Sequence, residues 1–172
     1  QPGDLLCVGG DLGNAAGALP LVLGQRSADA VIAQPLLAHY WSPQPQLALG
    51  LALRGKATSA LDISDGLLAD CGHIAKASAA RLVIEWQRLP LSVALLAFLG
   101  DDGAHAAALS GGDDYVLAFT LPPGELEPLL ADGWPVHVVG RVEAGSGVAL
   151  LDAAGQDITP AVGGYQHFRQ AP

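Results

Sequence analysis

The hydrophobic pattern of the chain alternates between short apolar runs and longer segments in which apolar residues recur every three or four positions. Short runs that end at glycine, proline or charge are typical of strands, and the longer segments are typical of helices. Strands are predicted at residues 4–10, 57–63, 81–89, 115–121, 135–142 and 147–152. Helices are predicted at residues 12–23, 27–41, 46–55, 65–78, 91–100 and 122–133. This alternation predicts an α/β or α+β fold with helices packed on a sheet.

The predicted helix at residues 65–78 shows the pattern most clearly. Its apolar positions fall on one helical face: Leu67, Leu68, Cys71, Ile74 and Ala75. Two prolines in residues 42–46 break the preceding helical pattern, so this stretch is the best candidate for an internal linker. A chain of 172 residues with 51% hydrophobic content can bury one proper core. One domain over residues 1–172 is therefore predicted.

The composition narrows the classes of function. Seventeen acidic residues oppose eight basic ones, and the formal net charge is −9. Because lysine and arginine form no stripe among aromatic residues, a nucleic-acid surface is not expected. No apolar run reaches the roughly 18 to 20 residues of a membrane helix, so membrane insertion is not expected either.

The two cysteines and the N-terminal residues indicate in which cellular compartment the protein is expected. Cys7 and Cys71 are too few for a disulfide framework and too isolated for a zinc site, and both thiols suit a reducing cytoplasm. The first residues have neither the basic start nor the apolar core of a signal peptide. The chain contains no methionine, which suggests that residue 1 is not where the gene begins.

The stretch "LDISDGLLAD", residues 61–70, carries the main candidate chemistry. Asp62 and Asp65 flank Ser64 where a predicted strand gives way to a predicted helix. In one interpretation Asp65 or Ser64 caps the helix and Asp62 is a solvated strand end. In the other, the oxygens converge at the strand end and hold Mg²⁺, which usually shares one or two carboxylates with water and substrate phosphates. The spacing favours a metal-nucleotide site.

A second acidic cluster, Asp113 and Asp114, follows two glycines before a predicted strand. From chemistry alone the preferred interpretation is an ordinary turn, because glycine and aspartate favour turn angles. The glycine turn at residues 9–17 lacks the Gly-Lys-Ser/Thr of a phosphate loop and a proper dinucleotide fingerprint, so it indicates tight packing.

Other familiar catalytic arrangements find little support. The five histidines show no metal-ligand spacing, and Ser64 and Ser110 have no visible His/Asp partners for a hydrolase triad. The tail contains Tyr165, His167 and Phe168. Such a tail is usually a docking segment, although an aromatic ring there could stack on a flat ligand.

Several of these segments together resemble one enzyme family. "ATSALDISDGLLADCGHIAKAS", "LPLS", "LSGGDDYVLAFT" and "GYQHF" are similar, in the right order, to segments of thiamine-monophosphate kinases. The resemblance implies a mixed β-sheet with packed helices, as in the C-terminal domain of aminoimidazole ribonucleotide synthetase-like enzymes. It also implies that an N-terminal ATP-binding domain is absent from this chain, and that the complete protein is a cytoplasmic homodimer.

The activity that the resemblance implies is transfer of the γ-phosphoryl group of ATP to thiamine monophosphate with several Mg²⁺ ions, giving thiamine diphosphate and ADP. Asp62 and Asp65 correspond to Mg²⁺ ligands and Ser64 to a contact with ATP. Asp113, where the family usually has glutamate, and Tyr165 correspond to contacts with thiamine monophosphate. No residue of this chain is expected to act as a general base, and the chain alone is expected to be inactive.

Two alternatives remain open. The chain could be a non-catalytic binding or assembly module with the same fold. It could also come from a related synthetase that phosphorylates an amide or a selenide, although no cysteine is placed for selenium chemistry.

Overall fold

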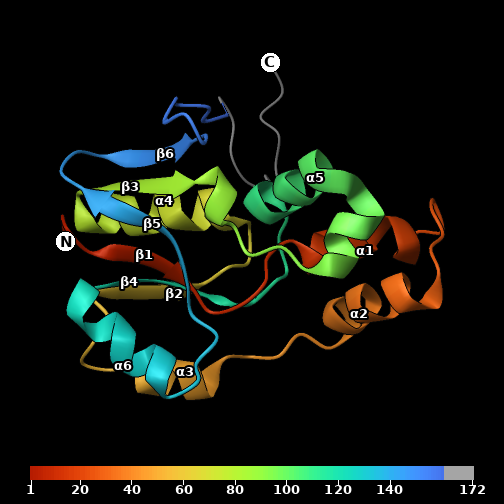
Figure 1. The fold of residues 1–172 in the computed structure, drawn as a ribbon, viewed down its shortest axis with the longest axis horizontal. Helices are drawn as coiled ribbons and strands as arrows, with labels where there is room; N and C mark the ends of the chain where they lie inside the picture. Colours follow the sequence, from red (N-terminus) through yellow and green to blue (C-terminus); the bar gives the residue numbers. More distant parts are fainter. Residues whose placement is uncertain (161–172) are drawn as a thin grey trace.

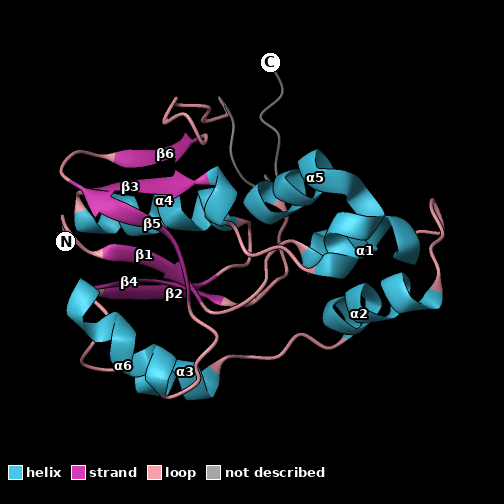
Figure 2. Cartoon of the chain, in the orientation of Figure 1, coloured by secondary structure: helices cyan, strands magenta, loops and turns pink. Residues whose placement is uncertain are grey.

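The computed structural model describes residues 1–160, in which six strands form one mixed sheet with helices packed against it (Figures 1 and 2). The strand order across the sheet is β2-β4-β1-β5-β3-β6. The strands are β1 (Leu5–Val8), β2 (Ser59–Asp62), β3 (Arg81–Glu85), β4 (Leu117–Leu121), β5 (His137–Glu143) and β6 (Gly147–Leu151). β3 and β6 run parallel, and the other neighbouring strands are antiparallel. The predicted fold class is confirmed.

The helices cover both faces of the sheet and extend beyond one end of it (Figure 1). They are α1 (Asn14–Val22), α2 (Ala30–Trp41), α3 (Leu47–Ala52), α4 (Leu67–Ser78), α5 (Val93–Ser110) and α6 (Leu126–Ala131). Strand alternation divides the core: Leu6 and Val8 of β1 face α4, whereas Cys7 faces α3 and α6. A third apolar cluster joins α1, α2 and α5 beside the sheet.

Most predicted elements are confirmed, although their ends differ by a few residues, and three differences bear on the fold. The strand predicted at residues 81–89 ends at Glu85, and Trp86–Arg88 form a 3-10 helix. The helix predicted to end at Gly100 is interrupted there, at φ 72° and ψ 176°, and then continues to Ser110. The apolar face predicted for residues 65–78 is buried as expected, although α4 begins only at Leu67.

Three connections meet at one end of the sheet because β1 and β2 both run antiparallel to β4. Val8 lies opposite Ala118 and Asp62 opposite Leu117, so β1 and β2 end where β4 begins. These connections are residues 9–13, which are the part of the glycine turn before α1, the acidic loop (residues 63–66) and the motif loop (residues 111–116). The architecture therefore gathers the candidate residues that are far apart in sequence.

The proline-containing stretch at residues 42–46 is the extended connection between α2 and α3. Its last side chain, Gln46, donates to the carbonyl of Gly9 at 2.7 Å and accepts from the amide of Leu117 at 2.9 Å. The connection is thus bonded to the ends of both β1 and β4. Within the described residues, none of the helices combines the length and the apolar character needed to cross a bilayer.

Candidate functional site

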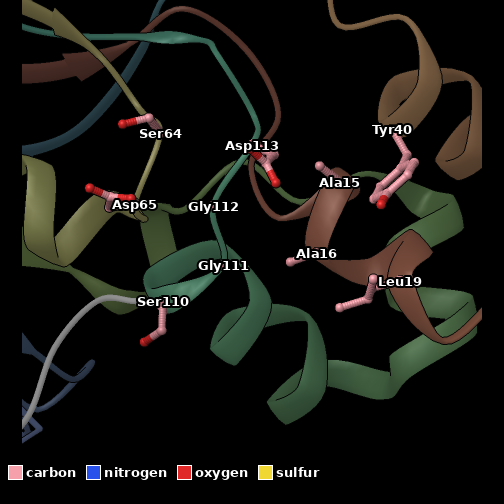
Figure 3. A pocket seen from close by; sticks show the side chains of 10 residues that line it. All are labelled: Ala15, Ala16, Leu19, Tyr40, Ser64, Asp65, Ser110, Gly111, Gly112 and Asp113. Atoms are coloured by element: carbon pink, nitrogen blue, oxygen red, sulfur yellow. The ribbon is translucent and has the colours of Figure 1, made fainter. Parts of the chain in front are cut away.

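A pocket of about 390 Å³ opens where the acidic loop, the motif loop and α1 meet (Figure 3). In the figure, the acidic-loop residues lie on one side of the pocket, the α1 residues on the other, and the two motif glycines between them. The lining residues are Ala15, Ala16, Leu19, Tyr40, Ser64, Asp65, Ser110, Gly111, Gly112 and Asp113. Three of the predicted site residues, Ser64, Asp65 and Asp113, are therefore brought together.

The acidic loop is shaped from inside by Asp70 of α4. The Oδ2 atom of Asp70 accepts hydrogen bonds from the amides of Ser64 at 2.9 Å and Asp65 at 3.0 Å. The Asp70 side chain is buried, and this burial raises its pKa, while the two amide hydrogen bonds lower it. One buried carboxylate thus determines the path of the backbone that carries two candidate site residues.

The helix-cap interpretation of Ser64 and Asp65 is wrong. α4 takes Gly66 as its N-cap residue, and a glycine has no side chain with which to cap the helix. Because β2 ends at Asp62, Ser64 lies in a bend and does not continue the strand alternation on which the convergence of Asp62 and Ser64 depended.

Close backbone contact joins the acidic loop to the motif loop. The amide of Asp113 donates to the carbonyl of Ser64 at 3.1 Å, and the amide of Tyr115 donates to the carbonyl of Ile63 at 2.9 Å. A Cβ atom at Gly112 would lie 2.3 Å from the Ser64 carbonyl oxygen, and one at Gly66 would lie 2.8 Å from the Ser110 carbonyl carbon. Glycine is therefore needed at both points of approach.

Tyr115 is a site residue that sequence reasoning missed. Its hydroxyl donates to Asp113 Oδ1 at 3.1 Å. This hydrogen bond is the main reason why the pKa of Tyr115 is raised, and the charges of Asp113, Asp62 and Asp65 add to the rise. All three candidate carboxylates therefore act on one exposed phenol group. The backbones of Asp113 and Tyr115 both have positive φ, 67° and 53°.

Asp62 lies outside the pocket, in a neighbouring apolar hollow of about 620 Å³. Pro43, Pro45, Gln46, Leu47, Gly50, Leu51, Tyr115 and Leu117 line the rest of this hollow. Tyr115 belongs to the wall of the hollow, and its hydroxyl bonds to Asp113 of the pocket. The two candidate metal ligands thus open into adjacent spaces.

The donor set at this end of the sheet suits a hard cation. Asp62 and Asp65 supply carboxylate oxygens, and Mg²⁺ usually takes one or two of these together with water and phosphate. No group of three or more His, Cys, Asp or Glu side chains gathers as a metal site within residues 1–160. A cation here would need further oxygens from a phosphate ligand or from another part of the protein.

The remaining predicted site residue is Tyr165, the expected contact with thiamine monophosphate. Tyr165 lies outside the described residues.

Asp114 occupies the interior of the motif loop, and the ordinary-turn interpretation does not describe it. Its buried carboxylate accepts from the amides of Gly13 at 2.6 Å and Ala15 at 3.3 Å. The turn interpretation rests on local sequence, whereas these partners come from the glycine turn and α1.

The sequence does contain a signal that Asp70 is buried. Asp70 lies three residues after Leu67 and four before Ile74, on the apolar face of α4.

Comparison with known proteins first defines the class of fold. The structure of E. coli HypE matches 100% of this chain and 52% of its own, with a TM-score of 0.69 and 21% identity. At that identity the likeness shows only the fold, a mixed sheet with packed helices. No family model matches the chain.

The particular resemblance is to thiamine-monophosphate kinases. The kinase of Escherichia coli (strain K12) is 38% identical over 173 residues, covering 98% of this chain and 53% of the kinase. The structure of AaThiL complexed with AMPPCP and TMP matches with a TM-score of 0.84 at 31% identity, over 98% of this chain and 52% of that one. The predicted resemblance is confirmed, and the chain spans about half the length of the curated relatives it matches.

Proposed function

We propose that residues 1–172 are the C-terminal α/β domain of a thiamine-monophosphate kinase. The observation that carries this proposal is the 38% identity to the Escherichia coli kinase over 98% of the chain. The match to AaThiL, whose structure holds the ATP analogue AMPPCP and TMP, supports ATP and thiamine monophosphate as the two substrates.

The candidate site residues divide by the ligand that each would meet. Asp62 and Asp65 would hold Mg²⁺, which would neutralise phosphate charge during transfer. The half-buried Ser64 hydroxyl would contact ATP, since it lies beside Asp65 in the acidic loop. Asp113, exposed at the pocket rim, would contact thiamine monophosphate, and Tyr165 would lie against the thiamine ring.

Phosphoryl transfer requires the protein to position the two substrates more than to move a proton. An oxygen of thiamine monophosphate forms a bond to the γ-phosphorus of ATP, while the bond from that phosphorus to the β,γ-bridging oxygen breaks and ADP leaves. The attacking phosphate oxygen already carries negative charge, so no side chain of this chain needs to remove a proton. The residues here therefore serve to bind and orient the two phosphates.

The relatives are about twice as long as this chain, so the proposal includes a second domain and a partner subunit. An N-terminal ATP-binding domain of the same polypeptide would contribute further metal ligands, and the complete protein would form a homodimer. Cys7 and Cys71 are both buried free thiols, which supports a reducing cytoplasm. The 172-residue chain alone would be inactive, because the proposed N-terminal domain would supply the rest of the site.

Product formation tests this function. The complete gene product and the 172-residue chain are each incubated with ATP and thiamine monophosphate, with and without Mg²⁺, and thiamine diphosphate is measured. Metal-dependent product from the complete protein but not from the chain is expected. No product from either would overturn the proposal and favour a non-catalytic binding module.

A further inference from the structure

Asp114 is a buried carboxylate that the reaction described above does not use. The residue is 1% exposed, and its two carboxylate oxygens accept from different amides: Oδ2 from Gly13 at 2.6 Å and Oδ1 from Ala15 at 3.3 Å. These partners are 101 and 99 residues away in sequence. The carboxylate therefore bonds the motif loop directly to the start of α1.

His39 of α2 bonds to the same residue. Its Nε2 atom lies 3.2 Å from the Asp114 carbonyl oxygen and 3.6 Å from Oδ1 of the carboxylate. The next residue along α2, Tyr40, lines the site pocket. Asp114 thus contacts both helices of the pocket wall that faces the acidic loop.

The neighbours of these contacts are themselves pocket residues. Asp113 precedes Asp114 in the motif loop, and Ala15 and Ala16 begin α1. The motif loop packs closely against α1, because a Cβ atom at Gly111 would lie 2.3 Å from the Cβ of Ala16. A change in how Asp114 bonds to α1 would therefore alter the width of the pocket and the direction of Asp113.

We propose that Asp114 is a positioning residue, which holds α1 and α2 against the motif loop and so sets the geometry with which Asp113 meets thiamine monophosphate. This inference rests on the proposed function. Asp114 acts through Asp113 and the pocket wall and does not itself touch substrate.

The electrostatics of Asp114 agree with this role. Burial raises its pKa to about 6, while the amides of Gly13, Ala15 and Asn14 and the charge of His39 lower it. The carboxylate is consequently ionised at neutral pH, and a charged acceptor makes the stronger hydrogen bonds. An asparagine at this position can offer only one oxygen and would turn an N–H group toward one of the two donating amides.

The test compares Asp114→Asn with Asp132→Asn in the complete gene product. Asp132 is exposed, at the end of α6, so its substitution is a matched control for the same chemical change. Steady-state kinetics are measured below the melting temperature of each variant. For Asp114→Asn the KM for thiamine monophosphate is expected to rise about tenfold, with a smaller change in kcat, because small misplacements in a site are costly. The control is expected to stay within about twofold of wild type.

A second variant keeps the proposal testable if Asp114→Asn does not fold. His39 is only half-buried, so His39→Gln is expected to fold and to raise the same KM by about threefold. An unchanged KM in a folded Asp114→Asn protein, or in His39→Gln where the first variant does not fold, overturns the role of Asp114. A wild-type protein that makes no thiamine diphosphate overturns the proposed function itself, and the role of Asp114 in that reaction falls with it.

Discussion

The amide nitrogen of Asp65 donates to Oδ2 of Asp70 at 3.0 Å, so one aspartate of the acidic motif holds the backbone of another. The same oxygen accepts from Ser64 at 2.9 Å. The two groups differ in exposure, since Asp70 is 4% exposed while Asp65 lines the pocket. The acidic residues at positions 62–70 thus differ in role: Asp70 shapes the loop, whereas Asp62 and Asp65 are the proposed metal ligands.

Substitution of Asp70 separates its role as an acceptor from its charge. Because a single oxygen accepts both hydrogen bonds, Asp70→Asn can keep them, whereas Asp70→Ala leaves two amide donors without this acceptor. We expect Asp70→Ala to lose about 2 kcal/mol or more of unfolding free energy and Asp70→Asn to lose clearly less. Denaturant unfolding measures both values. Equal losses in the two variants would mean that the charge, and not the acceptor, is what stabilises the loop.

Asp62 and Asp65 are expected to matter for turnover more than for folding. In the complete gene product, Asp62→Asn and Asp65→Asn each remove one proposed metal ligand, and we expect kcat to fall by roughly a hundredfold or more. Thermal unfolding should stay close to wild type for Asp62→Asn, because Asp62 is exposed. Measuring the Mg²⁺ concentration for half-maximal activity checks the assignment. A variant with near-normal activity would remove that residue from the metal site.

The contact between Gly112 and Ser64 can be tested with a matched pair of alanine substitutions. A Cβ at Gly112 would lie 2.3 Å from the Ser64 carbonyl oxygen, whereas a Cβ at Gly124 would meet nothing within 4 Å. Gly112→Ala should therefore destabilise the fold by about 2 kcal/mol or more and reduce activity. The free energy of unfolding of Gly124→Ala is expected to stay within about 0.5 kcal/mol of the wild-type value. Equal stability of the two variants would contradict the close approach of the loops.

The raised pKa of Asp114 predicts a specific dependence of stability on pH. The pKa rises from 3.8 to about 6 in the folded state, so the folded protein holds this proton more tightly than the unfolded chain does. The resulting stabilisation is complete below about pH 4 and is lost as the pH rises through about 6. Between pH 4 and pH 7, wild type should lose on the order of 2 kcal/mol relative to Asp114→Asn, which cannot ionise. Parallel pH curves for the two proteins would contradict the buried carboxylate.

The hydrophobic pattern predicted most of the fold because strand and helix periods follow from local sequence. The buried face of α4 and the strand–glycine turn–helix at β1 and α1 are examples. The end of the strand at Glu85 was missed because the residues after it still favour the strand pattern, and the second half of α5 was missed because Gly100 is typical of a helix end. Such boundaries depend on tertiary packing, which outweighs local propensity.

The candidate site was only partly predictable for the same reason. Ser64, Asp65 and Asp113 carry recognisable chemistry in short motifs, and the structure brings them to one pocket. Asp114 could not be distinguished from a turn residue, because its partners Gly13 and Ala15 are about a hundred residues away and bond through backbone amides. Tyr115 was likewise missed, since its importance comes from the hydrogen bond to Asp113 and from the charges of Asp62 and Asp65, which raise the pKa of its hydroxyl in the folded protein.

The central claim, phosphoryl transfer to thiamine monophosphate, is tested most directly by following a labelled γ-phosphoryl group. The complete gene product is incubated with γ-labelled ATP, Mg²⁺ and thiamine monophosphate, and the label is located after separation of the products. The account predicts label in thiamine diphosphate in a 1:1 ratio with ADP formed. Label that remains in ATP, or that is released as inorganic phosphate without thiamine diphosphate, would contradict it.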